Sequence, residues 1–588
     1  MKLMLHFRLG AAGLSALLAQ QVIAHGGTHN AGVSHISGMA SNATMLANKP
    51  YPPTYFSHPE HRHLIYAHIF LIVIAWVMVL PVAVMLSIAK SRFTLGSQYA
   101  FLAVNTLGLV FGALYGAETP NLYPNHAHGK VAWIASAVFA VQAVIGSVRK
   151  AAQAATQRSS KSFAETLAFI PSSANPVDGG YRSSSDSGQG TEPNTDSLRS
   201  HSDTALYDIG DQHEGHPSAA SLDKEYGHED DHESSENGFP SCHVSDSFST
   251  HAARIFSTAS WKYFDLFYKV IDRIILPLGF LALTTGIVTF GRFFEGKAIF
   301  SGLAHWIKGG VFFWLGLFTL GRWSGSFAEL GWAWNMRPQR RQLKWRPSAE
   351  FVESALIFIY GSTNIFLEHL GNWGSSWSAQ DLEHMAITVL FIGGGACGML
   401  VESSRVRDLL NTSTMAEVPV NDDLSNEERH EQVVPTTYAF SLNPIPALVI
   451  LLLGIMMSSH QQATMISSMV HKQWGNLLLG ASFARGLTYV LMYLRPPTSV
   501  LPSRPPTELL ASFGLIAGGI IFMASSSDTI EGMIHYNLDA MFMYTITMGL
   551  VGLLMAWEVI VLAIKGWAIR KERRLRSRNS WRSTEMRM

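Results

Sequence analysis

The sequence predicts an all-α, polytopic membrane protein with two helical bundles, about ten or eleven transmembrane helices and disordered cytosolic loops. Hydrophobic residues make up 48% of the chain and charged residues only 15%, whereas an ordinary soluble protein has about 25% charged residues. The apolar residues gather in long segments between polar connections, as membrane-spanning helices require. Acidic and basic residues are equal in number, so no basic surplus favours nucleic-acid binding.

The amino terminus has the pattern of a signal peptide, which we place at residues 1–24. Lys2 and Arg8 supply positive charge, an apolar stretch follows at residues 9–18, and Ala24 offers a small residue for cleavage. We therefore predict that the chain enters the secretory pathway and that its mature amino terminus is lumenal.

A lumenal segment is expected next, at residues 25–64. Asn42 opens an Asn-Ala-Thr sequon in it, which predicts glycosylation. Cleavage after the signal peptide would expose His25, whose amine and imidazole could chelate copper. A solvated, flexible segment is the simpler interpretation of these residues.

Eleven apolar segments are long enough, at about 20 residues, to cross the hydrocarbon core. They lie at residues 66–89, 99–116, 128–148, 271–291, 302–321, 351–370, 383–402, 443–459, 472–494, 507–525 and 540–564. The sixth is the weakest, because Glu353 and Glu368 interrupt it. The ninth carries Arg485, which needs a carboxylate or carbonyl partner inside the membrane. Glu402 and Glu558 are the candidates for that partner.

The distribution of Lys and Arg predicts the orientation of these spans. If the amino terminus is lumenal, the connections after the odd-numbered spans are cytosolic, and these connections hold most of the basic residues. The last of them is the basic tail at residues 567–588. We therefore predict that the carboxyl terminus is cytosolic. The protein itself is expected in the plasma membrane, the vacuole or the endoplasmic reticulum.

Two polar stretches divide the chain into its expected domains. The first bundle comprises residues 65–150 and, as its fourth helix, residues 256–291. Between these parts, residues 151–255 are rich in Ser, Asp, Glu, Gly and His and lack apolar periodicity, which predicts a disordered cytosolic loop. The C-terminal multi-span domain has two halves, residues 292–404 and 441–566. An acidic cytosolic loop, residues 405–440, is expected between them.

Two histidines in the first bundle form the main candidate site. His68 lies in the first span and His128 opens the third, and both helices begin on the same lumenal side. Two imidazoles at matched depth on neighbouring helices are what axial ligation of a b-type haem requires. His63 and His126 are alternates in the same neighbourhood. The competing interpretation is a four-helix scaffold without haem, whose histidines lie at the wet membrane boundary.

The first bundle resembles the core of the cytochrome b561 proteins. The residues that carry the resemblance are His68, Ala75, Trp76, Pro81, His128 and Gln142. The cytochrome b561 family has four core helices and four histidines that bind two haems, one near each membrane face. The resemblance covers residues 65–150 and 262–291, and it implies His68 and His128 as the ligands of the lumenal-side haem.

This sequence departs from the b561 pattern at the other two histidines. Their positions fall on Phe101 in the second helix and near Tyr268 in the fourth. Neither residue ligates haem in the usual bis-histidine way, so the resemblance implies at most one haem b. One haem near the lumenal face does not easily pass electrons across the whole bilayer.

A second group of histidines lies at span ends in the C-terminal domain. Its members are His369, His384, His460, His471 and His535, with Glu368, Asp381, Glu383 and Glu531 beside them. All fall at or near the predicted lumenal face, so together they could bind a transition metal or a proton. No HExxH or paired CxxC motif supports a metal, and boundary histidines are common where one side is wet. His305 in the fifth span is expected to pack.

At the scale of the whole chain, the sequence resembles the fungal Ytp-type membrane proteins. The matching segments are residues 24–26, 381–402, 458–460, 471–475 and 503–508. Such proteins combine a signal peptide, a b561-like region and a longer multi-span domain. The resemblance implies a link to electron transport and supplies no catalytic residues.

Three functional hypotheses follow. The leading one is an electron-transfer protein with one b-type haem at His68 and His128, a haem-dependent membrane oxidoreductase if it is an enzyme. The second is a transporter or a metal- or proton-handling protein that uses the C-terminal histidines. The third is a non-catalytic membrane scaffold. Membrane lipid is the expected partner, and the sequence names neither an electron donor nor an acceptor.

Overall fold

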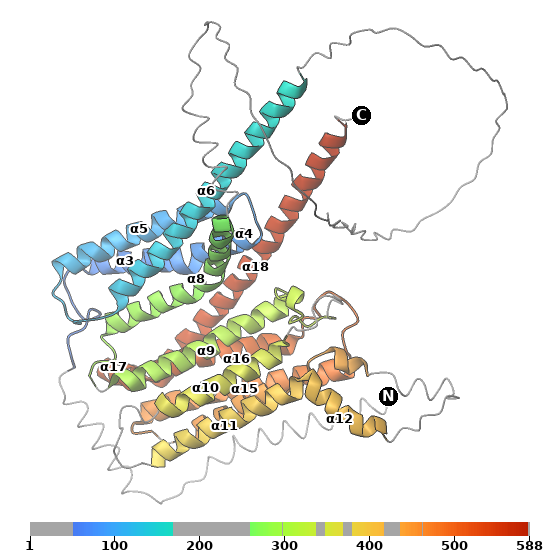
Figure 1. Cartoon of the computed structure of the whole chain (residues 1–588). Coiled ribbons are helices and arrows are strands. Elements are labelled where there is room, and N and C mark those ends of the chain that lie inside the picture. Colours follow the sequence, from blue (N-terminus) through green and yellow to red (C-terminus); the bar gives the residue numbers. More distant parts are fainter. Residues whose placement is uncertain are drawn as a thin grey trace, which may run out of the picture. The chain divides into compact units, whose positions relative to one another are not determined.

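The computed structural model describes residues 51–168, 259–296, 298–336, 347–367, 379–416, 435–460 and 462–585. Every regular element in these ranges is a helix (Figure 1), which confirms the predicted all-α fold. The predicted signal peptide, the sequon at Asn42 and His369 lie outside the described residues.

The first bundle is built from four long helical segments. Its elements are α3 (Arg62–Val73), η1 (Ile74–Val79), α4 (Leu80–Ile88), α5 (Thr94–Glu118), α6 (His128–Ala168) and α8 (Ala259–Gly291). The first three form one continuous span with a π-helical turn in its middle. Pro81 follows that turn and has no N–H to donate to the Val77 carbonyl four residues earlier. Trp557 Nε1 donates to that carbonyl, at 2.8 Å.

The C-terminal domain contains the remaining helices. They are α9 (Ala298–Ser324), η2 (Ala328–Leu330), α10 (Ala349–Leu367), α11 (Ala379–Glu402), α12 (Ser404–Ala416), η4 (Thr436–Ala439), α14 (Ile445–Ser459), α15 (Met465–Leu494), α16 (Pro506–Ala524), α17 (Ser527–His535) and α18 (Ala540–Glu585). Over the described part of the chain, nine helices are long and apolar enough to cross a membrane. The other two predicted spans also form helices, α10 and the 15-residue α14.

In three stretches that were predicted as loop or tail, the first residues are helical. The structure continues α6 to Ala168, places α12 inside the predicted acidic loop, and extends α18 to Glu585. Ala, Lys, Arg, Glu and Gln favour helix without regard to hydropathy, and the added parts of α6 and α18 are rich in them. Hydropathy marks where the apolar span ends, but the helix itself ends later.

Two hydrophobic cores hold the bundles together. The first centres on Trp76 and Phe101, and the second on Trp474 and Phe522, whose rings stack 4.0 Å apart. Both cores lie in one compact unit, to which the described residues from 51–147 and from 264–585 belong, while the described residues 148–168 and 259–263 belong to a second unit. The predicted boundary between the first bundle and the C-terminal domain, at residue 292, stays a prediction.

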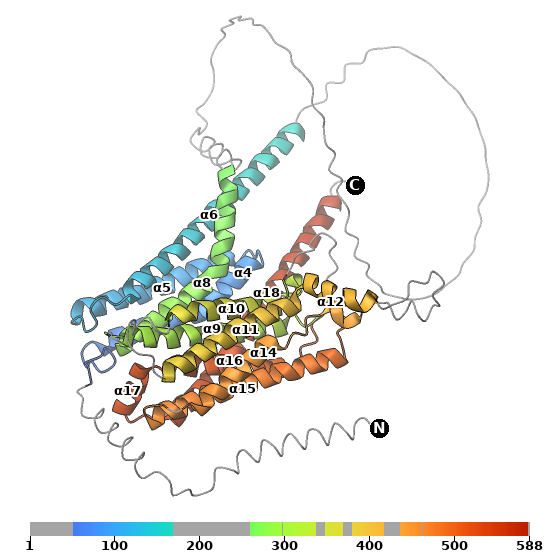
Figure 2. The same ribbon diagram turned by 60° about the horizontal axis from the view of Figure 1, so that its bottom comes forward.

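Close backbone approach organises the second core around α16. In Figure 2, α9, α16 and α15 lie side by side. A Cβ on Gly309 of α9 would lie 2.5 Å from the Gly519 carbonyl oxygen of α16, and one on Gly316 equally close to the Ile516 side chain. Small residues allow such close packing of membrane helices. The Ser512 hydroxyl adds a 2.9 Å hydrogen bond to the Gly316 carbonyl.

Candidate functional site

His68 and His128 face each other at one end of the first bundle. Their ring centroids lie 6.1 Å apart and their planes meet at 77°. His68 comes from the second turn of α3, and His128 is the first residue of α6. The structure therefore brings together the two histidines that the sequence analysis selected because they were expected at similar depth in the membrane.

Hydrogen bonds through Nδ1 orient both rings. Nδ1 of His68 lies 2.8 Å from the Gly108 carbonyl oxygen, so this nitrogen carries the hydrogen and Nε2 keeps its lone pair. Nδ1 of His128 lies 3.4 Å from the Thr285 hydroxyl. Metal-binding histidines are commonly held in this way, with one nitrogen bonded to a protein oxygen and the other free to ligate.

Glycines leave room for both rings on the facing helices. A Cβ on Gly112 of α5 would lie 2.7 Å from Nδ1 of His68, closer than non-bonded atoms approach. A Cβ on Gly286 of α8 would lie 3.1 Å from Cε1 of His128. Glycine at these two positions therefore permits the observed placement of the histidines.

The two rings meet edge to face, and their centroid distance of 6.1 Å is within the range of about 4.5–7 Å for rings in contact. The two imidazoles are therefore neighbours, and they are the residues that would hold a haem iron at this end of the bundle.

Aromatic packing fills the core at the position of the first missing b561 histidine. Phe101 has no exposed surface, and its ring lies 5.1 Å from that of Trp76 and 4.3 Å from that of Phe139. No imidazole stands at this position, so the residues here do not fit a second bis-histidine haem.

A buried hydrogen-bond network surrounds the other missing position, Tyr268. The Gln98 amide donates to the Tyr268 hydroxyl at 3.0 Å, and the Ser87 hydroxyl lies 3.1 Å from it. Asp272 accepts hydrogen bonds from Gln142 at 2.6 Å and from Ser87 at 2.8 Å. These hydrogen bonds join four helices, while Oε1 of Gln98 and Oε1 of Gln142 are buried without a hydrogen bond to the described residues.

The alternate histidines pair elsewhere. His126 lies in the loop before α6, with its ring 6.3 Å from that of Tyr123, and burial lowers its pKa below the ordinary value. His63 is exposed, and its ring lies 6.4 Å from that of His61. The structure therefore places neither of them in the facing pair.

The C-terminal histidines form pairs rather than one cluster. Nδ1 of His460 lies 2.9 Å from a Glu383 carboxylate oxygen. The ring of His471 lies 6.0 Å from that of His305, and His535 stacks on Tyr51 with the ring centroids 4.4 Å apart.

The described residues contain no group of three or more His, Cys, Asp and Glu side chains that could hold a metal ion. His384 lies half-buried on α11, beside Glu383 in the sequence. His305 packs its ring 5.7 Å from that of Phe522, and its Nδ1 lies 2.8 Å from the Ser301 carbonyl oxygen.

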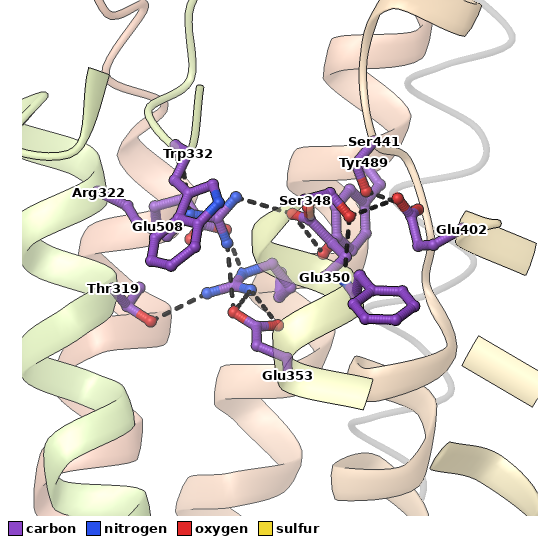
Figure 3. A network of polar contacts seen from close by, with 12 residues as sticks. Thr319, Arg322, Trp332, Ser348, Glu350, Glu353, Glu402, Ser441, Tyr489 and Glu508 are labelled. Atoms are coloured by element: carbon purple, nitrogen blue, oxygen red, sulfur yellow. Dashed lines mark hydrogen bonds and ion pairs between the residues drawn. The ribbon is translucent and has the colours of Figure 1, made fainter. Parts of the chain in front are cut away.

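A buried charge network that the sequence did not predict joins four helices (Figure 3). We define it as Arg322, Glu350, Glu353, Arg485 and Glu508, all less than one-tenth exposed. Our prediction that Glu402 or Glu558 pairs with Arg485 was wrong, because Glu353 and Glu508 hold it. Glu402 accepts hydrogen bonds from Ser348 at 2.5 Å and from Ser441 at 2.7 Å.

Two family models cover most of the described chain. Residues 278–566 match the model described as "Protein YTP1-like, C-terminal", and residues 49–152 match a domain of unknown function, DUF2427. An uncharacterized membrane protein of Schizosaccharomyces pombe is 33% identical over 549 residues, which are 91% of this chain and 99% of the relative. The chain belongs to the YTP1-like family.

Two further relatives match shorter parts of the chain. An uncharacterized membrane protein of Saccharomyces cerevisiae is 41% identical over 305 residues, which are 50% of this chain and 46% of the relative. Protein YTP1 of the same yeast is 24% identical over 182 residues, 31% of either chain. No solved structure matches this chain.

The histidine pair and the charge network fall within the matches of different family models. His68 and His128 fall within the DUF2427 match, and the charge network falls within the YTP1-like match. This YTP1-like chain is therefore an integral membrane protein, as its helices and the names of its relatives agree. The cytochrome b561 resemblance of the first bundle stays a prediction.

Proposed function

We propose that this YTP1-like protein binds one b-type haem between His68 and His128 and transfers electrons at one face of the membrane. The observation that carries the proposal is the facing pair of imidazoles, 6.1 Å apart, in a helical membrane bundle. The order of residues in the first bundle, which resembles cytochrome b561, supports the same ligands.

Bound at this pair, haem supplies a one-electron redox centre. The chain's own residues set its position. The Gly108 carbonyl accepts the Nδ1 hydrogen of His68, which leaves the lone pair of Nε2 available to a ligand and makes this nitrogen more basic. The Thr285 hydroxyl lies beside Nδ1 of His128 and favours the same arrangement.

Hydrogen bonds below the pair fix the helices that carry it. Trp76 Nε1 donates to the Asn105 side-chain oxygen at 2.8 Å, and the Asn105 amide donates to Ser136 at 2.9 Å. These bonds connect the first, second and third spans in the interior, where a satisfied network is rigid. Rigid helices hold the two ligands at a constant separation whether or not an electron is present.

Position in the bundle limits the electron partners. The hydrocarbon core is about 30 Å thick, and the histidine pair lies near one end of the spans. His68 and His128 would hold a haem within reach of electron partners at that face only, which the charge pattern predicts to be lumenal.

The test is an absorption spectrum of the purified full-length protein after expression with ample haem. We expect a Soret band and reducible b-type bands for the wild type, and their loss in His68→Ala and in His128→Ala. His63→Ala and His126→Ala serve as matched controls, since each removes a nearby histidine outside the pair. Absence of these bands from the wild type, or their persistence in both ligand variants, would refute the proposal.

A second candidate function is metal or proton handling by the C-terminal histidines. Two contacts favour it: the pairing of His460 with Glu383, and the 6.0 Å spacing of the His305 and His471 rings. Metal content and uptake should then fall in His471→Ala and in His460→Ala, while His535→Ala, which alters the stack on Tyr51, should change neither. Unchanged content and uptake in the first two variants would eliminate this candidate.

A further inference from the structure

The polar end of α18 contacts the turn between α4 and α5. The Glu572 carboxylate accepts hydrogen bonds from the Arg92 backbone N–H at 3.1 Å and from the Ser91 hydroxyl at 3.4 Å. The Trp567 ring stacks on the Phe93 ring, with the centroids 5.9 Å apart. A polar contact and an aromatic contact therefore hold this turn against α18.

Hydrogen bonds within the turn order its backbone. The Ser91 N–H donates to the Leu86 carbonyl at 3.0 Å, and the Lys90 N–H donates to the Ser87 carbonyl at 2.9 Å, which closes the end of α4. The Thr94 hydroxyl donates to the Ser91 carbonyl at 2.7 Å, at the start of α5. The side chains of the turn are therefore carried on an ordered backbone.

Two cations lie against one exposed aromatic ring of this turn. The Arg92 guanidinium carbon is 5.0 Å from the centre of the Phe93 ring, and the Lys571 ammonium nitrogen is 4.9 Å from it. Lys571 also lies 4.7 Å from the centre of the Trp567 ring. Phe93 is 40% exposed and Trp567 is 51% exposed. Cation–π contacts orient the two charged groups but supply no anion to neutralise them.

Further cations follow Lys571 along one side of α18. An α-helix turns by about 100° per residue, so residues that are four, then three, then four positions apart share one side. Trp567 and Lys571 begin such a series, and Arg574 and Arg578, which are exposed, continue it. We define the basic stripe as Arg92 of the turn together with Lys571, Arg574 and Arg578 of α18.

The basic stripe begins at the surface of the membrane and continues away from it. The apolar part of α18 ends at Ile564, and each helical residue adds about 1.5 Å along the axis. Lys571 therefore lies roughly 10 Å, and Arg574 roughly 15 Å, along the helix from that point. The headgroup layer of one leaflet is about 5–8 Å thick. The stripe thus extends beyond the layer in which an ordinary phospholipid carries its charge.

The chemistry of the stripe is that of a phosphate site. Basic clusters next to a membrane span attract anionic lipid headgroups, and Arg binds phosphate through two parallel hydrogen bonds. A headgroup with a single charge meets such a stripe only at its beginning. An inositol headgroup that carries several phosphates extends from the bilayer and offers negative charge at successive distances. The stripe therefore fits the second kind of headgroup.

We propose that the basic stripe binds the headgroup of a multiply phosphorylated phosphoinositide in the same membrane. Arg92 and Lys571 contact the phosphates nearest the bilayer, and Arg574 and Arg578 contact those further out. The charge pattern predicts this end of α18 to be cytosolic, so the lipid comes from the cytosolic leaflet. The site involves neither the histidine pair nor haem.

The test is the binding of dioctanoyl phosphatidylinositol bisphosphate to the purified full-length protein in a neutral detergent, measured by native mass spectrometry. The stripe variant combines Arg574→Gln with Arg578→Gln, and binding should weaken about fivefold for each cation removed. The matched control combines Arg573→Gln with Arg576→Gln. It removes the same charge from exposed positions on the other side of the same helix, so the affinity should change little.

A second stripe variant, Lys571→Gln, removes the cation that contacts both rings. It should weaken binding by a similar factor, and its thermal stability should match that of the control pair. Dioctanoyl phosphatidylserine should bind more weakly than the bisphosphate lipid to the wild type. Inositol trisphosphate, which has no acyl chains to place it at the membrane surface, should also bind more weakly.

Five results would overturn the proposal. The wild type could fail to bind the bisphosphate lipid, or the stripe and control pairs could lose the same affinity, so that net charge alone governs binding. Phosphatidylserine could bind as tightly, which would make the stripe a general anionic surface. Inositol trisphosphate could bind as tightly, which would indicate a soluble ligand. Binding that appears only after deletions within residues 151–255 would assign the stripe to that acidic part of the chain.

Discussion

At the scale of single residues, Arg485 shows how this protein tolerates charge inside the membrane. A lone arginine in a span is costly, and here two carboxylates and the Thr319 hydroxyl surround it. The same arrangement makes each member dependent on the others, because removing one partner leaves buried charge uncompensated. Buried residues of this kind are therefore more sensitive to substitution than exposed charges nearby.

Arg485→Ala is expected to destabilise the protein severely, by about 3–5 kcal/mol, because it removes one partner of a buried ion-pair network. Arg495→Ala is the matched control, since Arg495 lies ten residues further along at the exposed end of the same helix. Thermal unfolding of the two variants in the same detergent measures the difference. Equal losses of stability in both would contradict the role given to the network.

At the scale of elements, glycines determine how closely helices approach. Gly112 and Gly116 lie one turn apart on α5, but their surroundings differ. A Cβ on Gly112 would collide with the imidazole of His68, whereas a Cβ on Gly116 would meet nothing within 4 Å. Alanine variants at the two positions therefore distinguish an effect on the histidine pair from the general effect of replacing a helical glycine by alanine.

Gly112→Ala should displace the His68 ring and sharply reduce haem content, and Gly116→Ala should leave haem content unchanged. Quantitative haem extraction from equal amounts of the folded variants makes the comparison. A normal haem content in Gly112→Ala would mean that the observed placement of His68 is not the ligating one.

A second element-scale feature is the π-helical turn before Pro81. Trp557→Phe removes the 2.8 Å hydrogen bond to the Val77 carbonyl and keeps an aromatic ring in place. An unsatisfied buried polar group costs about 1–3 kcal/mol, so the variant should unfold at a lower temperature than the wild type. Trp567→Phe, at a half-exposed position of α18, is the control. The assignment fails if both variants lose the same stability.

At the scale of the whole molecule, hydropathy predicted the helices of the apolar segments but not α12 or α17. Each of the eleven predicted spans coincides with a helix over its described residues, because a segment of that length must satisfy its backbone within itself in lipid. The expected similar depth of His68 and His128 made them candidates, and the structure places their rings 6.1 Å apart. The extra length of α6 and α18 was missed, since hydropathy does not report polar helix.

The partners of Arg485 could not be predicted, because sequence gives the depth of a residue but not which helices are neighbours in the plane of the membrane. Glu353 made its helix look weak as a span, yet that carboxylate is buried between two arginines. The sequence signal that could have found the network is a simple count: spans with unpaired positive charge and spans with unpaired negative charge must meet.

Orientation of the whole chain is tested by its two glycosylation sequons. We expect glycan on Asn42, which the charge pattern places in the lumen, and none on Asn411, whose Asn-Thr-Ser sequon follows an odd-numbered span. Glycosidase treatment should therefore shift the mobility of the wild type and of Asn411→Gln, but not of Asn42→Gln. Glycan on Asn411 would reverse the orientation.

The number of haems per chain is the most direct test of the central proposal. The measurement is the ratio of haem b to protein in the purified full-length protein, determined from the pyridine haemochrome spectrum. We predict one, because His68 and His128 form one facing pair, while Phe101 and Tyr268 stand where a second pair would be needed. A ratio of zero would contradict haem binding, and a ratio of two would contradict the assignment of the ligands.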